Sequence, residues 1–86
     1  MNLKSYFSLF LVLYSFISFS QNTYVPDDNF EQALIDLGYD VGPLNDFVPT
    51  ANIENITFLI IQNKGIVDLT GIEDFTALES FNCTDN

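Results

Sequence analysis

The sequence predicts an α/β solenoid, in which an N-terminal capping helix is followed by short parallel strands joined by irregular arcs. Three observations predict it. The N-terminus has the order of charge and hydropathy found in an export signal. A helix-length apolar stripe with start and stop signals follows. Residues 53–86 then repeat an apolar pattern after 22 residues, and internal periods of roughly 20 to 29 residues are typical of solenoids.

Residues 1–20 are predicted to be a signal peptide. Lys4 supplies a positive end, residues 6–17 form an apolar run, and the small residues Ser18 and Ser20 follow as a cleavage signal. The alternative is an uncleaved membrane anchor, since the run has no charge. The run is shorter than the ~20 residues that a membrane span needs. We therefore expect a secreted or cell-surface protein with no membrane span in the mature chain.

The charge of the chain excludes several functions. Twelve acidic residues stand against two basic ones, for a net charge of −10. Nucleic acid and anionic lipid are disfavoured as partners, because binding to phosphate needs clustered lysine and arginine. The chain has no histidine, the usual general base and the commonest metal ligand. Its one cysteine, Cys83, cannot form an internal disulfide.

A helix is predicted over about residues 28–37, within an N-terminal cap at 21–52. Asp28 is the expected N-cap, and Glu31, three residues later, would complete a capping box. Gly38 stands where helices commonly end in a left-handed conformation. The apolar stripe has the spacing i, i+3, i+4, i+7 and consists of Phe30, Ala33, Leu34 and Leu37.

The rest of the cap is predicted to lack regular structure. Residues 21–26 should be extended ahead of a proline, and residues 39–52 should form a loop rich in glycine, proline and polar residues. The acidic residues Asp36, Asp40 and Asp46 are spaced too irregularly for an EF-hand calcium loop. We interpret them as solvated turn residues, and we predict no metal site and no cofactor.

The repeat pattern covers residues 53–86. A shift of 22 residues places the apolar positions of one copy on those of the next. Alternation around Leu59 and around Phe81 predicts short strands, and a spacing of three residues between them predicts a tight arc. The predicted repeat core comprises Ile56, Leu59, Ile61, Ile66, Leu69, Ile72, Phe75, Leu78, Phe81 and Cys83.

Here the chain resembles the leucine-rich-repeat family, whose motif is L-x-x-L-x-L-x-x-N-x-L. The second copy reads Leu78-Glu-Ser-Phe-Asn-Cys-Thr-Asp-Asn86, with Asn86 at the asparagine position. The first copy departs from the motif by having Lys64 there. The spacing from Ile66 to Leu78 looks most like the 22-residue bacterial class, which includes internalin-like proteins, and the stretch from Thr23 to Asn86 resembles the start of secreted repeat proteins of Bacteroidetes type. The resemblance implies a capped but incomplete array, and we expect an N-terminal fragment of a longer protein that is marginally stable alone.

The resemblance also implies a function in recognition. Strand residues that point away from the core line a concave face, and an unknown protein or surface glycan is the expected partner. The first of two alternatives is that Phe58 and Ile60 pack under the cap or a neighbour. The cap then serves only as the structural start of a longer protein whose activity, enzymatic or not, lies downstream. The second is an enzyme within this segment, which the absence of histidine and of any evident pocket disfavours. The predicted binding face comprises Phe58, Ile60, Gln62, Ser80, Asn82 and Thr84.

Overall fold

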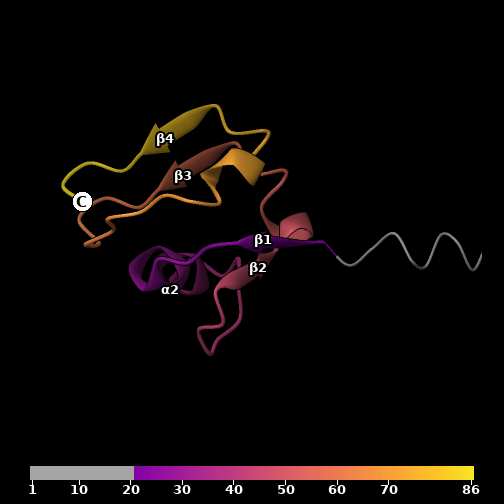
Figure 1. The fold of residues 1–86 in the computed structure, drawn as a ribbon. Coiled ribbons are helices and arrows are strands. Elements are labelled where there is room, and N and C mark those ends of the chain that lie inside the picture. Colours follow the sequence, from indigo (N-terminus) through magenta and orange to yellow (C-terminus); the bar gives the residue numbers. More distant parts are fainter. Residues whose placement is uncertain (1–20) are drawn as a thin grey trace, which may run out of the picture.

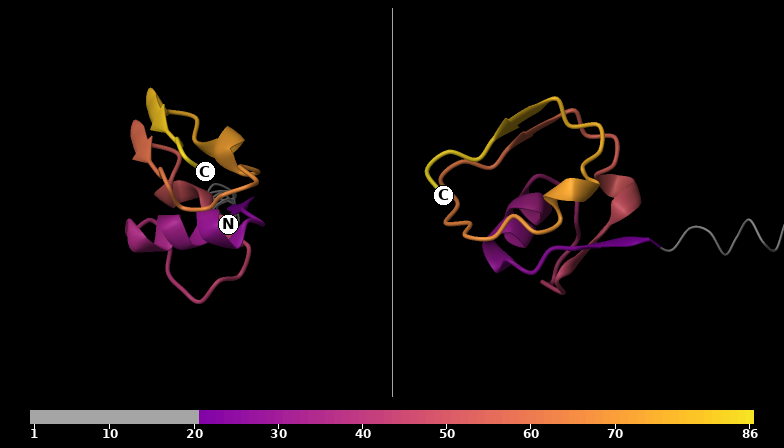
Figure 2. Two further views of the ribbon diagram at one scale, coloured as in Figure 1. Left: turned by 90° about the vertical axis from the view of Figure 1, so that its left-hand side faces the viewer. Right: turned by 45° about the horizontal axis from the view of Figure 1, so that its top comes forward.

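The computed structural model describes residues 21–86 (Figure 1). The predicted signal peptide at 1–20 lies outside the described residues. In chain order residues 21–86 contain one α-helix, four short strands in two separate sheets and two short 3-10 helices. The helix and the first sheet form one part of the molecule, and the second sheet with its long connection lies against it (Figures 1 and 2).

The helix α2 spans Asp28–Asp36, and its N-cap is Asp27 rather than the predicted Asp28. The Asp27 carboxylate accepts the Phe30 amide at 2.9 Å, which satisfies one of the free N–H groups of the first turn. The predicted capping box is also wrong, since both carboxylate oxygens of Glu31 bond elsewhere. They accept the backbone amides of Asn45 at 2.9 Å and Asp46 at 3.0 Å.

The apolar stripe of α2 is shorter than predicted. Phe30, Ala33 and Leu34 are buried, whereas Leu37 is 48% exposed. Gly38 has the left-handed φ of +89°, and the chain reverses there. The amide of the next residue, Tyr39, bonds back to the Leu34 carbonyl at 2.9 Å. Tyr39 packs against the core where Leu37 does not.

The first sheet pairs β1, Asn22–Tyr24, with β2, Phe47–Pro49, in antiparallel register. The prediction of a loop over 39–52 is therefore wrong at its end, where β2 is followed by a 3-10 helix at Thr50–Asn52. Buried Thr23 explains part of this pairing. Its hydroxyl lies 2.8 Å from that of Thr50 and donates to Asp74 at 2.9 Å, so β1 bonds to its partner segment and to the distant connection.

The second sheet pairs β3, Phe58–Ile60, with β4, Ser80–Asn82, in parallel. Register partners such as Leu59 and Phe81 are 22 residues apart. Between the strands the chain returns past α2 and passes through a 3-10 helix at Ile72–Asp74 (Figure 2). The 22-residue offset of the sequence pattern is thus the register of this sheet.

One hydrophobic core joins the two parts. Phe30 of the helix stacks on Phe75 of the returning chain, with ring centroids 6.1 Å apart. Gly71 allows the backbones to come close at a second point, because a Cβ there would lie 2.6 Å from the Tyr24 carbonyl oxygen. The buried apolar residues are Val25, Phe30, Ala33, Leu34, Val48, Ile53, Ile56, Leu59, Ile61, Ile66 and Phe75.

Candidate functional site

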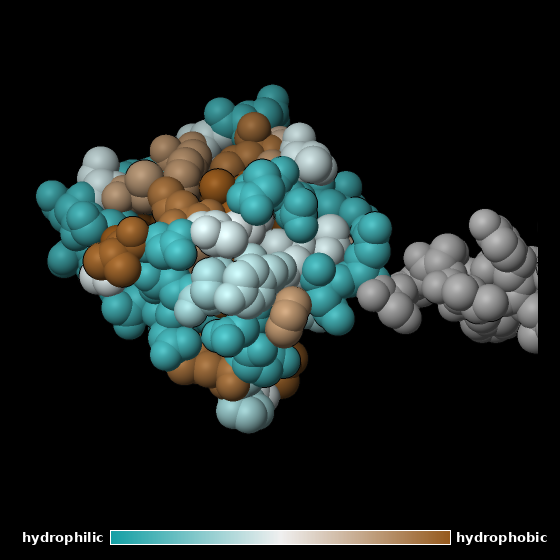
Figure 3. Space-filling model, viewed as in Figure 1, coloured by the Kyte–Doolittle hydropathy of each residue, from teal (hydrophilic) through white to brown (hydrophobic). Residues whose placement is uncertain are grey.

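The most exposed apolar surface of the second sheet lies on β3. Side chains of a strand alternate between its two faces, so buried Leu59 leaves its neighbours on the opposite side. Leu59 is 1% exposed, whereas Phe58 is 60% and Ile60 is 53% exposed. Figure 3 shows apolar side chains gathered in the upper part of the molecule, where β3 and β4 lie, beside a largely hydrophilic surface.

The register places a more polar row beside it. Ser80 lies opposite Phe58, and Asn82 lies opposite Ile60. Asn82 donates to the Gln62 side chain at 3.0 Å and accepts the Thr84 hydroxyl at 2.9 Å. The structure therefore brings all six residues of the predicted binding face to one side of the sheet, with an apolar end on β3 and a hydrogen-bonded polar end after it.

Burial of the predicted repeat core decreases toward β4. Five of its ten residues are buried, and Leu69, Ile72, Leu78 and Cys83 are partly buried against them. Phe81 departs from the prediction because it is 38% exposed. Its register partner Leu59 lies under the cap, whereas no strand covers the outer side of β4 within residues 21–86.

Asn86 connects the second copy of the pattern to the first. Its side-chain carbonyl accepts the amides of Lys64 at 2.7 Å and Ile66 at 3.2 Å. Its amide donates to the carbonyls of Ile61 at 2.7 Å and Cys83 at 2.9 Å. An asparagine suits this place because it offers both donors and an acceptor on a short stem.

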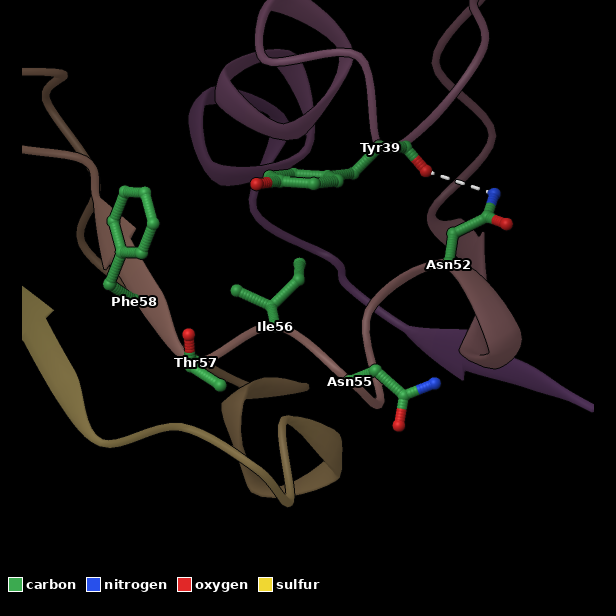
Figure 4. A pocket seen from close by; sticks show the side chains of 6 residues that line it. All are labelled: Tyr39, Asn52, Asn55, Ile56, Thr57 and Phe58. Carbon is green, nitrogen blue, oxygen red and sulfur yellow. Dashed lines mark hydrogen bonds between the residues drawn. The ribbon is translucent and has the colours of Figure 1, made fainter.

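A pocket of about 340 Å³ opens where the cap meets β3. Figure 4 shows the hydroxyl end of the Tyr39 ring directed toward the strand that carries Phe58, with Ile56 below the ring. Sequence reasoning missed this pocket, since residue 39 was predicted to lie in a featureless loop. We call it the cap–strand pocket, and its lining residues are Tyr39, Asn52, Asn55, Ile56, Thr57 and Phe58.

Three carboxylates of the cap lie close together. Asp28, Glu31 and Asp46 each place an oxygen within 4.8 Å of the others. Backbone N–H donors on both oxygens of Glu31 account for the burial of this side chain without an ion. Of the three acidic residues that the sequence analysis considered for calcium, only Asp46 belongs to this cluster.

Asp27 links the helix to the returning chain. Its second oxygen accepts the amides of Val67 and Asp68, both at 3.0 Å. Burial acts to raise the pKa of this carboxyl, but backbone N–H donors, among them Phe30, together outweigh burial and lower the pKa below its ordinary value. The Thr70 hydroxyl and amide likewise lower the pKa of exposed Asp68. The carboxylate form of Asp27 is therefore favoured by amides of its own helix and by two amides of the returning chain.

Comparison with models of known protein families, with curated proteins and with solved structures gives no match. Within residues 21–86 no helix has the length and apolar character needed to cross a bilayer.

Proposed function

We propose that this chain is an exported, non-catalytic binding module of the leucine-rich-repeat type that recognises a protein or a glycan. The observation that carries the proposal is the exposure of Phe58 and Ile60 on either side of buried Leu59. Large apolar side chains gathered on a surface mark interaction sites more often than isolated ones do. The parallel register at an offset of 22 residues supports the repeat assignment, since each coil would place its strand beside the last.

The chemistry of the face supports a partner with both apolar and hydrogen-bonding groups. An aromatic ring such as Phe58 contributes most when its partner removes it from water. The polar end at Gln62, Asn82 and Thr84 offers amide and hydroxyl groups already held by one another, so little side-chain freedom is lost on binding. A net charge of −10 favours a neutral or basic partner over a phosphate-rich one.

A second role is favoured by the exposed Phe81 and the partly buried Leu78 and Cys83. In this role residues 21–52 cap a longer repeat array, whose next coil would cover this row. The helix and β1 bond to the returning chain through Asp27 and Thr23, as a cap must do to begin an array. The two roles are compatible, because the cap covers one end of the core and the binding face lies along the strands.

The test replaces Phe58 and Ile60 with serine in the full chain and measures both thermal stability and binding to arrays of glycans and extracellular proteins. The matched control replaces Val41 and Val67, which are 82% and 91% exposed, with serine. We expect the first variant to lose binding while its melting temperature stays unchanged. The control variant should keep its binding. A fall in melting temperature of the first variant alone would assign Phe58 and Ile60 to packing and overturn the proposal for this face.

A further inference from the structure

The cap–strand pocket differs in its charge from two other cavities within residues 21–86. None of its six lining residues is charged, although the chain has twelve acidic residues. A cavity beside β2 is lined by Asp40, and a cavity beside β1 is lined by Glu54 and Asp74. A cation or an amine would therefore favour those cavities, and the cap–strand pocket suits a neutral ligand.

Its lining combines aromatic rings with amides. Tyr39 and Phe58 come from different parts of the chain and line the same cavity (Figure 4). Asn52 uses one N–H to bond the Tyr39 carbonyl at 3.0 Å, which leaves its carbonyl oxygen and a second N–H for other partners. Asn55 and Thr57 are exposed and add an amide and a hydroxyl at the same cavity.

We propose that the cap–strand pocket binds one ring of a neutral sugar. This proposal names the class of partner for the proposed binding function, and it rests on that function. The C–H groups on one side of a pyranose ring have partial positive charge, and they meet the negative face of an aromatic ring favourably. The hydroxyl groups at the edge of the sugar can donate to and accept from asparagine amides. Phe58 also belongs to the binding face, so a longer glycan would continue from the pocket along β3.

Other occupants fit less well. An apolar side chain of a partner protein would cover the Asn52 and Asn55 amides without replacing their hydrogen bonds to water, at a cost in affinity. An acidic sugar would be repelled by the net negative charge. A volume of about 340 Å³ lies at the lower end of the range for ligand pockets, which fits a single ring better than a folded oligomer.

The experiment is an NMR titration of the full chain with methyl glycosides of glucose, mannose, galactose and N-acetylglucosamine. The side-chain amide signal of Asn55 reports on this pocket, whereas that of Asn52 reports both on this pocket and on the cavity beside β2. We expect saturable shifts at these signals with at least one glycoside, at a dissociation constant of about 1–10 mM, and at least about fivefold weaker binding of methyl glucuronide.

Two variants and a matched control test the assignment. Asn55→Ala changes an exposed side chain and should weaken binding about fivefold, the effect of one lost hydrogen bond. Tyr39→Ala should weaken it more, and the helical circular dichroism shows whether that variant is folded. Asn22→Ala, an exposed asparagine of β1 outside this pocket, should bind as the parent does.

No saturable shift at about 100 mM glycoside, well above the expected dissociation constant, overturns the sugar proposal. Equal affinity of Asn55→Ala and the parent overturns it as well. If the serine variant of Phe58 and Ile60 loses a protein partner while no glycoside binds, the proposed function stands and only the sugar assignment fails. If neither partner nor glycoside binds, both fail.

Discussion

Replacing Gly71 with alanine tests how closely the two parts of the molecule must approach. The new Cβ would lie 2.6 Å from the Tyr24 carbonyl oxygen and 2.9 Å from a Val25 methyl carbon, whereas ordinary contacts begin at 3.4 Å. The carbonyl belongs to the β1 backbone and cannot turn away as a flexible side chain would. Either β1 or the returning chain must therefore move by about 0.8 Å to restore ordinary contact.

Two costs add at this position. The φ of Gly71 is +107°, where a Cβ costs about 1–2 kcal/mol. Overpacking a close contact costs a further ~1–3 kcal/mol. The sum, about 2–5 kcal/mol, is roughly half of the total stability of about 3–10 kcal/mol for a domain of this size, so we expect Gly71→Ala to be much less stable than the parent.

Gly38→Ala is the matched control. Gly38 also has a positive φ, +89°, but a Cβ there would meet nothing within 4 Å, so only the backbone cost of about 1–2 kcal/mol remains. Urea denaturation followed by far-ultraviolet circular dichroism and tyrosine fluorescence measures both variants, since the chain has no tryptophan. A Gly71 variant as stable as the Gly38 variant would refute the close approach.

Three further predictions concern single side chains. The lowered pKa of Asp27 stabilises the folded state fully above the ordinary value of 3.8, and this contribution is lost as pH falls through the lower folded pKa. An asparagine has one acceptor oxygen for the backbone amides that Asp27 binds with two, so Asp27→Asn should cost about 1–2 kcal/mol at neutral pH. It should also flatten the acid side of the stability curve measured by urea denaturation; parallel curves would contradict this. Glu31→Gln should cost about 1–3 kcal/mol, because an amide accepts only one of the two backbone N–H groups that the carboxylate accepts; an unchanged urea midpoint would contradict it. Leu59→Ala should cost about 2–5 kcal/mol, whereas Phe81→Ala should cost less because Phe81 is 38% exposed; equal losses in melting temperature would show that both positions are equally packed.

The helix could be predicted from the sequence, but its start could not. The apolar spacing places Phe30 and Leu34 on one side, and both are buried. Adjacent Asp27 and Asp28 are equally good N-caps by residue type. The amides that favour Asp27 lie some 40 residues away, at Val67 and Asp68, where no local pattern points to them.

The offset of the strand pair could also be predicted, whereas β2 and the pocket could not. The 22-residue shift places Leu59 on Phe81, and the register pairs them. The strand Phe47–Pro49 is too short to show alternation, and it ends at a proline. The cap–strand pocket joins Tyr39 to residues 52–58, which meet only because Gly38 turns the chain back beside the core.

The shared carboxylate of Asp27 has a consequence for how the protein opens. One oxygen accepts an amide of the helix and the other accepts two amides of the returning chain. Movement of the helix therefore strains the bonds to the returning chain, and movement of the returning chain strains the bond to the helix. Local unfolding of such linked segments tends to occur as one cooperative unit. The amide protons of Phe30, Val67 and Asp68 should then exchange with solvent deuterium through a single common opening, although they lie about 40 positions apart in the chain.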